Sequence, residues 1–147
     1  SNNYYLIGSH DNHDGLTHYR LDRILNLCIS DEYAIDAKEK VGPNPESYIQ
    51  NYIKESVDHY SGDVIRIDVE YEPDPAMNAI LYDFAGKDVK VHKQKDGLYR
   101  ATFSKMNSVT LIGWFLQYGN WFKVISPKNL KTEVISELEK ALQKYDD

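Results

Sequence analysis

Two arginines in an otherwise acidic stretch are the residues best suited to bind a ligand. Arg20 and Arg23 are the only Lys or Arg among residues 1–33, which also hold Asp11, Asp14, Asp22, Asp31 and Glu32. A guanidinium presents a planar fork of donors that fits a phosphate or a carboxylate. Tyr5 lies on the segment expected to pair with this one, and its ring or hydroxyl suits a base or an anion. These residues predict an anion-binding site.

The same residues also allow a purely structural interpretation. Arg20 can pair with Asp22 or Glu32 on a solvated strand face while Tyr5 sits in the core, and spacing alone favours this alternative. Asp22 is expected to orient Arg23 or to bridge to the turn, because a free carboxylate would repel an anionic ligand. Both interpretations remain open from the residues alone.

Histidines near the expected hairpin raise the question of a metal. The candidate ligands are His10, His13 and His18 with Asp11 and Asp14. Their spacing matches no standard zinc pattern, and Asp, Asn and Gly are frequent in turns for conformational reasons, so we expect no metal and no cofactor. His10 and His18 are instead expected to line the same pocket as Arg20. Their protonation would tighten anion binding below about pH 6.5.

Composition excludes several classes of protein. The formal charge of −6 argues against broad binding to a phosphate backbone. The sequence has no nucleophile elbow, phosphate loop or dinucleotide fingerprint, so we expect no enzyme. No run approaches the roughly 20 apolar residues of a membrane span. The single cysteine, Cys28, allows no internal disulfide and is expected to be a small buried side chain, which favours a cytoplasmic protein.

The first part of the chain is predicted to hold a hairpin and a helix. Residues 4–9 and 16–29 are rich in Tyr, Leu and Ile, and they flank the turn signal Asn12-His13-Asp14-Gly15. Asn44-Pro45 predicts the start of an amphipathic helix over 46–60, with Gly62 as its stop. We therefore expect a hairpin module at 1–33 and a linker with a helix at 34–62.

The remainder, 63–147, is predicted to form one α+β domain. Alternation and capping signals predict strands at 64–71, 88–94, 98–104 and 121–125, with helices after Asp74, Asn107 or Ser108, and Ser126. This order is βαββαβ plus a terminal helix, the arrangement of ferredoxin-like domains. Trp114, Phe115, Trp121 and Phe122 are expected to pack in its core. A basic cluster is expected to be a solvated face or a secondary phosphate contact, and it consists of Lys87, Lys90, Lys93, Lys95, Arg100 and Lys105.

The hairpin residues resemble the WYL domain. That family is named for a Trp-Tyr-Leu strand, followed after a hairpin by Arg-Leu-Asp-Arg-Ile. Tyr4 stands in place of the family's tryptophan, and the matching residues are Tyr5, Leu6, Arg20, Leu21, Asp22, Arg23 and Ile24. The second half resembles WCX, the C-terminal extension of these proteins, through Trp114-Phe115-Leu116, Gly119, Val124-Ile125-Ser126-Pro127 and the closing helix.

The resemblance implies a fold and a function. The fold is a partial Sm/SH3-like barrel, followed by the ferredoxin-like domain. The function is the sensor region of a bacterial helix-turn-helix transcription regulator, which would reach operator DNA only through its missing N-terminal domain. An anionic ligand, either single-stranded nucleic acid or a nucleotide, would bind at Tyr5, His10, His18, Arg20 and Arg23. A homodimer is expected, and the rival interpretation is a structural dimerisation module without its own ligand. A third interpretation, based on fold analogy alone, is that the α/β half binds a small metabolite as other ferredoxin-like sensors do.

Overall fold

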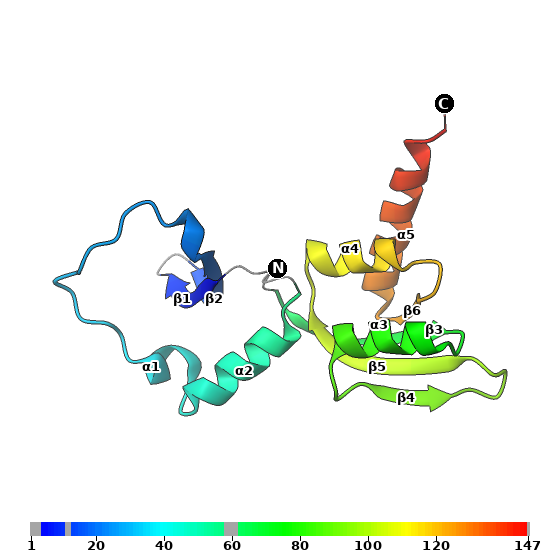
Figure 1. Ribbon diagram of the computed structural model, residues 1–147, viewed down its shortest axis with the longest axis horizontal. Helices are drawn as coiled ribbons and strands as arrows, with labels where there is room; N and C mark the ends of the chain where they lie inside the picture. The colour runs from blue at the N-terminus through cyan, green and yellow to red at the C-terminus, as the bar shows by residue number, and fades with distance from the viewer. Residues whose placement is uncertain (1–3, 11–12, 58–61, 147) are drawn as a thin grey trace. The chain divides into compact units, whose positions relative to one another are not determined.

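The chain forms a mixed α/β structure with two antiparallel sheets. The computed structural model describes residues 4–10, 13–57 and 62–146, and within them it holds five α-helices and six strands. The chain divides into two compact units, residues 1–61 and 62–147, which are described separately (Figure 1).

The first unit opens with the predicted hairpin, but its second strand is shorter than predicted. Strands β1 (Tyr5–His10) and β2 (His13–Arg20) pair antiparallel. The prediction of a strand over 16–29 is wrong beyond residue 20, because the Leu21 N–H donates to the Tyr4 carbonyl at 3.0 Å and the chain then turns into the 3-10 helix η1 (Leu21–Arg23). His13 to Gly15 lie in β2 instead of a turn, while Asn12 lies outside the described residues. The described residues of this unit form no closed barrel.

Residues 24–36 form neither helix nor strand and are exposed throughout. Leu25, Leu27 and Ile29 are 93, 90 and 99% exposed. Cys28 is exposed as well, so the expectation of a buried thiol is wrong. That expectation followed from apolar neighbours, and those neighbours are themselves exposed.

Two helices follow, and the first of them was not predicted from the sequence. Helix α1 (Ala37–Val41) is capped by Asp36, whose carboxylate accepts the Lys38 N–H at 2.9 Å. Helix α2 (Pro45–Glu55) has Pro45 in its first turn, as predicted. It ends before residue 60, because Ser56 is extended and its hydroxyl donates to the Ile53 carbonyl at 2.9 Å.

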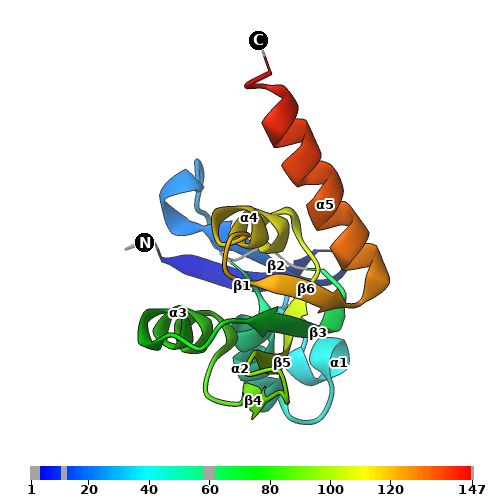
Figure 2. The same cartoon turned by 90° about the vertical axis from the view of Figure 1, so that its right-hand side faces the viewer.

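The second unit matches the predicted order of elements. It consists of β3 (Val64–Tyr71), α3 (Pro75–Ala85), β4 (Lys90–Lys93), β5 (Tyr99–Met106), α4 (Val109–Gln117), β6 (Lys123–Ser126) and α5 (Lys128–Gln143). The four strands form one antiparallel sheet in the order β4-β5-β3-β6 (Figure 2). Asp74 and Ser108 cap α3 and α4 as the sequence predicts, since their side chains accept helix N–H groups.

The core of this unit lies between the sheet and helices α3 and α4, which cover one face of the sheet (Figure 2). Ile67 and Val69 on β3 and Phe115 on α4 are fully buried. Burial of each such side chain stabilises the fold by about 1.5–3 kcal/mol. Phe84 and Trp114 stack at 4.0 Å between ring centroids and join the two helices.

Two expectations for individual residues of this unit are wrong. Trp121 is 48% exposed and so is not a core residue, although Phe122 beside it is buried. Lys105 is buried, with its Nζ 5.3 Å from the centre of the Phe84 ring, so it is not part of a solvated basic face.

A carboxylate links three strands on the other face of the sheet. Asp68 on β3 accepts hydrogen bonds from the Thr102 hydroxyl at 2.5 Å and from the Ser126 hydroxyl at 2.8 Å. The bond from Thr102, supported by that from Ser126, lowers the pKa of Asp68 against the opposing effect of burial. This network stabilises the register between β5, β3 and β6.

The last helix, α5, is buried only along its first half. Leu130 and Val134 are buried, whereas Leu138 and Leu142 are 40 and 64% exposed. Across the described residues, no helix has the length and apolar character needed to traverse a bilayer.

Candidate functional site

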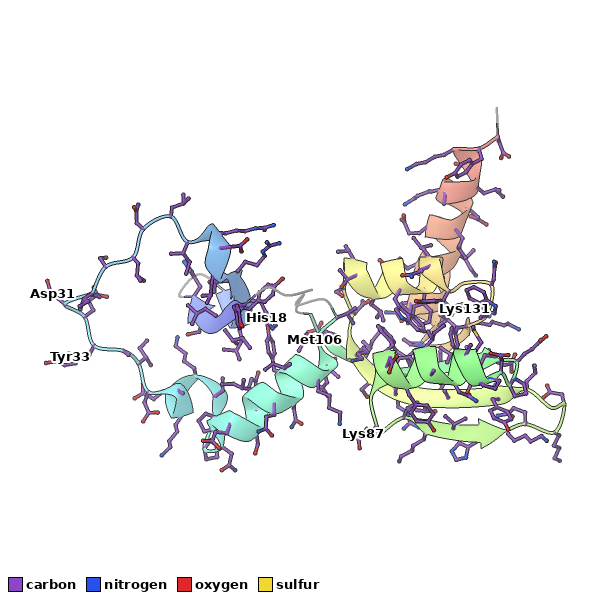
Figure 3. All side chains as sticks on the ribbon, viewed as in Figure 1. His18, Asp31, Tyr33, Lys87, Met106 and Lys131 are labelled. Atoms are coloured by element: carbon purple, nitrogen blue, oxygen red, sulfur yellow. The ribbon has the colours of Figure 1, made fainter. Side chains whose placement is uncertain are left out.

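The hairpin register brings Tyr5 and Arg20 together. Tyr5 on β1 pairs directly with Arg20 on β2, and Ile7 pairs with His18. Facing residues of an antiparallel pair project to the same side, and residues two apart on a strand share that side. One face of the hairpin therefore carries Tyr5, Ile7, His18 and Arg20, and Figure 3 labels His18 on this strand pair.

Asp22 holds the guanidinium of Arg20 on this face. Arg20 Nε donates to one carboxylate oxygen at 3.0 Å and Nη2 donates to the other at 2.6 Å. This bond, with the negative charge of Asp22 and a smaller effect of Tyr5, raises the pKa of Arg20. The same bond lowers the pKa of Asp22, to which Arg23 adds a weaker attraction. The Arg20–Asp22 pair of the structural interpretation is thus present. Asp22 was also expected to orient Arg23, but the side-chain hydrogen bonds that it accepts come from Arg20.

The Arg20–Asp22 pair is accessible, because the two side chains are 29 and 58% exposed. A pair in this position is well hydrated and weak, so an incoming anion can compete for the guanidinium. The pair keeps the fork in one orientation beside Tyr5. This arrangement can bind a phosphate or carboxylate group through the donors of Arg20 that Asp22 does not occupy.

Helix α2 supports this face of the hairpin through Tyr52. The Tyr52 hydroxyl donates to the Leu16 carbonyl at 2.7 Å and lies 3.3 Å from His18 Nδ1. The Tyr52 ring stacks on the His18 ring at 5.0 Å, and Tyr5 meets His18 edge-on at 6.1 Å. Helical spacing indicates that Tyr52 lies on the buried face of α2 but not which strand it contacts, so this role of Tyr52 was not predicted.

Of the other two predicted ligand residues, Arg23 follows the hairpin and His10 lies at the far end of β1. Arg23 is exposed on η1, three residues after Arg20. His10 lies at the opposite end of β1 from Tyr5, about 17 Å away for five residues of strand, so the structure does not bring it beside Arg20.

The described residues offer no group of three or more His, Cys, Asp or Glu side chains arranged to hold a metal ion. Asp11 lies outside those residues, and the structure does not describe the side chains of His13 and Asp14.

Comparison with known families gives one match, which covers most of the second unit and the end of the first. The WCX domain model matches residues 51–142, more than half of the chain, and the chain therefore belongs to the WCX domain family. WCX domains occur in WYL-domain regulators, so the match indicates the C-terminal region of a WYL-type regulator. No curated protein matches the sequence.

Proposed function

We propose that this chain is the sensor region of a bacterial WYL-type transcription regulator and that it binds an anionic ligand, either single-stranded nucleic acid or a nucleotide. The observation that carries the proposal is the direct pairing of Tyr5 with Arg20, whose guanidinium Asp22 holds on an accessible face of the hairpin. The role is binding without catalysis. Ligand binding would bias a helix-turn-helix domain that the resemblance to the family places N-terminal to this sequence.

Each residue of the proposed site has a defined task. Arg20 contacts a phosphate through the part of its fork that faces away from Asp22, and Arg23 adds a second positive charge. Tyr5 offers its ring to a base, with which stacking is worth about 1–3 kcal/mol in single-strand binders. His18 is held between Tyr5 and Tyr52, so its ring is fixed on the same face of the hairpin as Arg20.

The proposal includes a specific fold for each unit. The element order βαββαβ and the strand order β4-β5-β3-β6 support a ferredoxin-like second unit. The strand pair β1–β2 with its Tyr-Leu and Arg-Leu-Asp-Arg-Ile residues supports a first unit that is part of an Sm/SH3-like barrel.

Fluorescence anisotropy with a labelled oligothymidylate tests the proposed site. The Arg20→Ala/Arg23→Ala double variant is expected to bind at least about tenfold more weakly and to show a salt dependence reduced by about one to two counterions. The matched control, Lys38→Ala/Lys40→Ala, removes the same charge from α1 in the same unit and should bind nearly as the parent chain does. If both double variants lose the same affinity for the oligothymidylate, the loss comes from the change in net charge, and the proposed site is rejected.

A second candidate function, a dimerisation module, is favoured by the exposed segment at residues 24–36. Leu25, Leu27 and Ile29 alternate as in a strand, and all three are almost fully exposed. A run of this kind can pair with the same run of a second copy. Light scattering separates the candidates: if Leu27→Glu or the double arginine variant converts a dimer into a monomer while no anion binds, the dimerisation role is correct and the sensor role is not.

A further inference from the structure

The second unit contains a pocket whose lining is rich in carboxylates, unlike the arginine-bearing hairpin. It has a volume of about 700 Å³ and lies where β3 gives way to α3, next to the loop between α4 and β6. That volume is in the range of pockets that hold small ligands, roughly 300–1,000 Å³. Its walls combine carboxylates with an aromatic ring, and the residues that define its character are Glu70, Glu72, Asp74, Leu98, Trp121 and Lys123.

The negative charge of this pocket is only partly compensated. Glu70 lies 3.6 Å from both Arg100 Nη2 and Lys123 Nζ, so its charge is balanced within the fold. Glu72 has no ion pair or hydrogen bond with the described residues and is exposed. Asp74 uses one oxygen, Oδ1, to accept two N–H groups at the start of α3. Two carboxylates of the lining are thus left without a cationic partner among the described residues.

Trp121 provides an aromatic wall that the core does not use. Its side chain is 48% exposed, while its backbone is fixed because its N–H donates to the Tyr118 carbonyl at 3.0 Å. The Tyr118 ring meets the Trp121 ring at a tilt of 45°, with 6.1 Å between the ring centroids. An indole held in place next to carboxylates is a favourable site for a cation, because the ring face carries negative electrostatic potential.

We propose that this pocket binds an organic cation, namely a protonated amine carried on a small apolar body. The ammonium group contacts Glu72 and Asp74 and lies against the indole of Trp121. The apolar body packs on Leu98. This preference is opposite in charge to that of the hairpin, so the proposal does not depend on the anion site.

A series of three probes with the same hexyl body isolates the charge. Hexylamine is protonated at neutral pH, since amines of this kind titrate near pKa ~10.4, whereas 1-hexanol is neutral and hexanoate is an anion. Each is titrated into the ¹⁵N-labelled full chain while amide NMR shifts are recorded. Hexylamine is expected to shift the amides of Glu72, Leu98 and Trp121 saturably, with 1-hexanol weaker and hexanoate without effect.

Substitutions then test the two walls of the pocket. Trp121→Ala should weaken hexylamine about three- to thirtyfold, and Glu72→Gln about two- to fivefold. Glu139→Gln on α5, which removes the same charge outside the pocket, should bind as the parent chain does. Equal binding of 1-hexanol and hexylamine, saturable shifts only outside the pocket, or unchanged affinity in both wall variants would each overturn the proposal.

Discussion

Replacing Tyr52 by Phe removes the hydroxyl that joins α2 to the hairpin and leaves the ring in place. The substitution removes the 2.7 Å donation to the Leu16 carbonyl and the 3.3 Å contact with His18 Nδ1, while the ring stack on His18 at 5.0 Å and 17° is retained. A neutral hydrogen bond contributes about 0.5–1.5 kcal/mol net. We therefore expect the free energy that holds the hairpin on α2 to fall by about 1 kcal/mol, which makes detachment about fivefold more frequent.

Native-state hydrogen exchange of the β1 and β2 amides measures this detachment. The control is Tyr48→Phe, which removes the same hydroxyl from a side chain of the same helix that is 44% exposed. In Tyr52→Phe the hairpin amides should exchange about two- to twelvefold faster, with those of the second unit unchanged. Identical exchange in the two variants would show that the Tyr52 hydroxyl does not hold the hairpin on α2, and would refute this role of Tyr52 in the candidate site.

Three further substitutions probe the second unit. Asp68→Asn should cost about 1–2 kcal/mol at pH 7 in urea unfolding, because it weakens charge-assisted bonds. The pKa of Asp68 is lowered in the fold, so this difference should be complete above about pH 4, the unfolded value, and vanish as pH falls through the lower folded value; a difference constant with pH contradicts it. Phe115→Ala, at a fully buried ring, should cost about 3–5 kcal/mol, and a loss below about 1 kcal/mol would contradict the described core. Gly62→Ala places a methyl group against the Asn107 carbonyl, so it should lower the melting temperature more than Gly113→Ala, where a methyl meets open space.

Much of the second unit could be predicted from the sequence because its signals are local and consistent. Alternation over residues 64–71 predicts β3, whose residues Ile67, Val69 and Tyr71 are buried as expected. Asp74 before Pro75 predicts the start of α3, where the carboxylate does accept two N–H groups. Capping and periodicity need no knowledge of distant residues.

The errors fall where an element depends on a partner distant in sequence. Residues 21–29 are apolar enough for a strand, but apolar character alone does not supply the strand that would pair with them. Trp121 and Phe122 are adjacent aromatic residues in the segment after α4, and the sequence does not indicate which of them is buried. The structure shows that Phe122 is buried and Trp121 is exposed.

The candidate site was predictable only where it depends on residues close in sequence. A hairpin fixes its own register, so Tyr5 and Arg20 could be expected to meet. Spacing alone favoured an ion pair of Arg20 with either Asp22 or Glu32, and the structure shows Asp22 as the partner. The contact from Tyr52 joins residues 34 positions apart in sequence, which no local pattern encodes.

The most direct test of the sensor proposal is the Nε–Hε resonance of Arg20 during titration with pentathymidylate. If the hairpin face is the anion site, this resonance should shift saturably while those of Arg66 and Arg100 in the second unit remain in place. An unmoved Arg20 resonance, or equal shifts at all three arginines, would contradict a ligand site built on Tyr5 and Arg20.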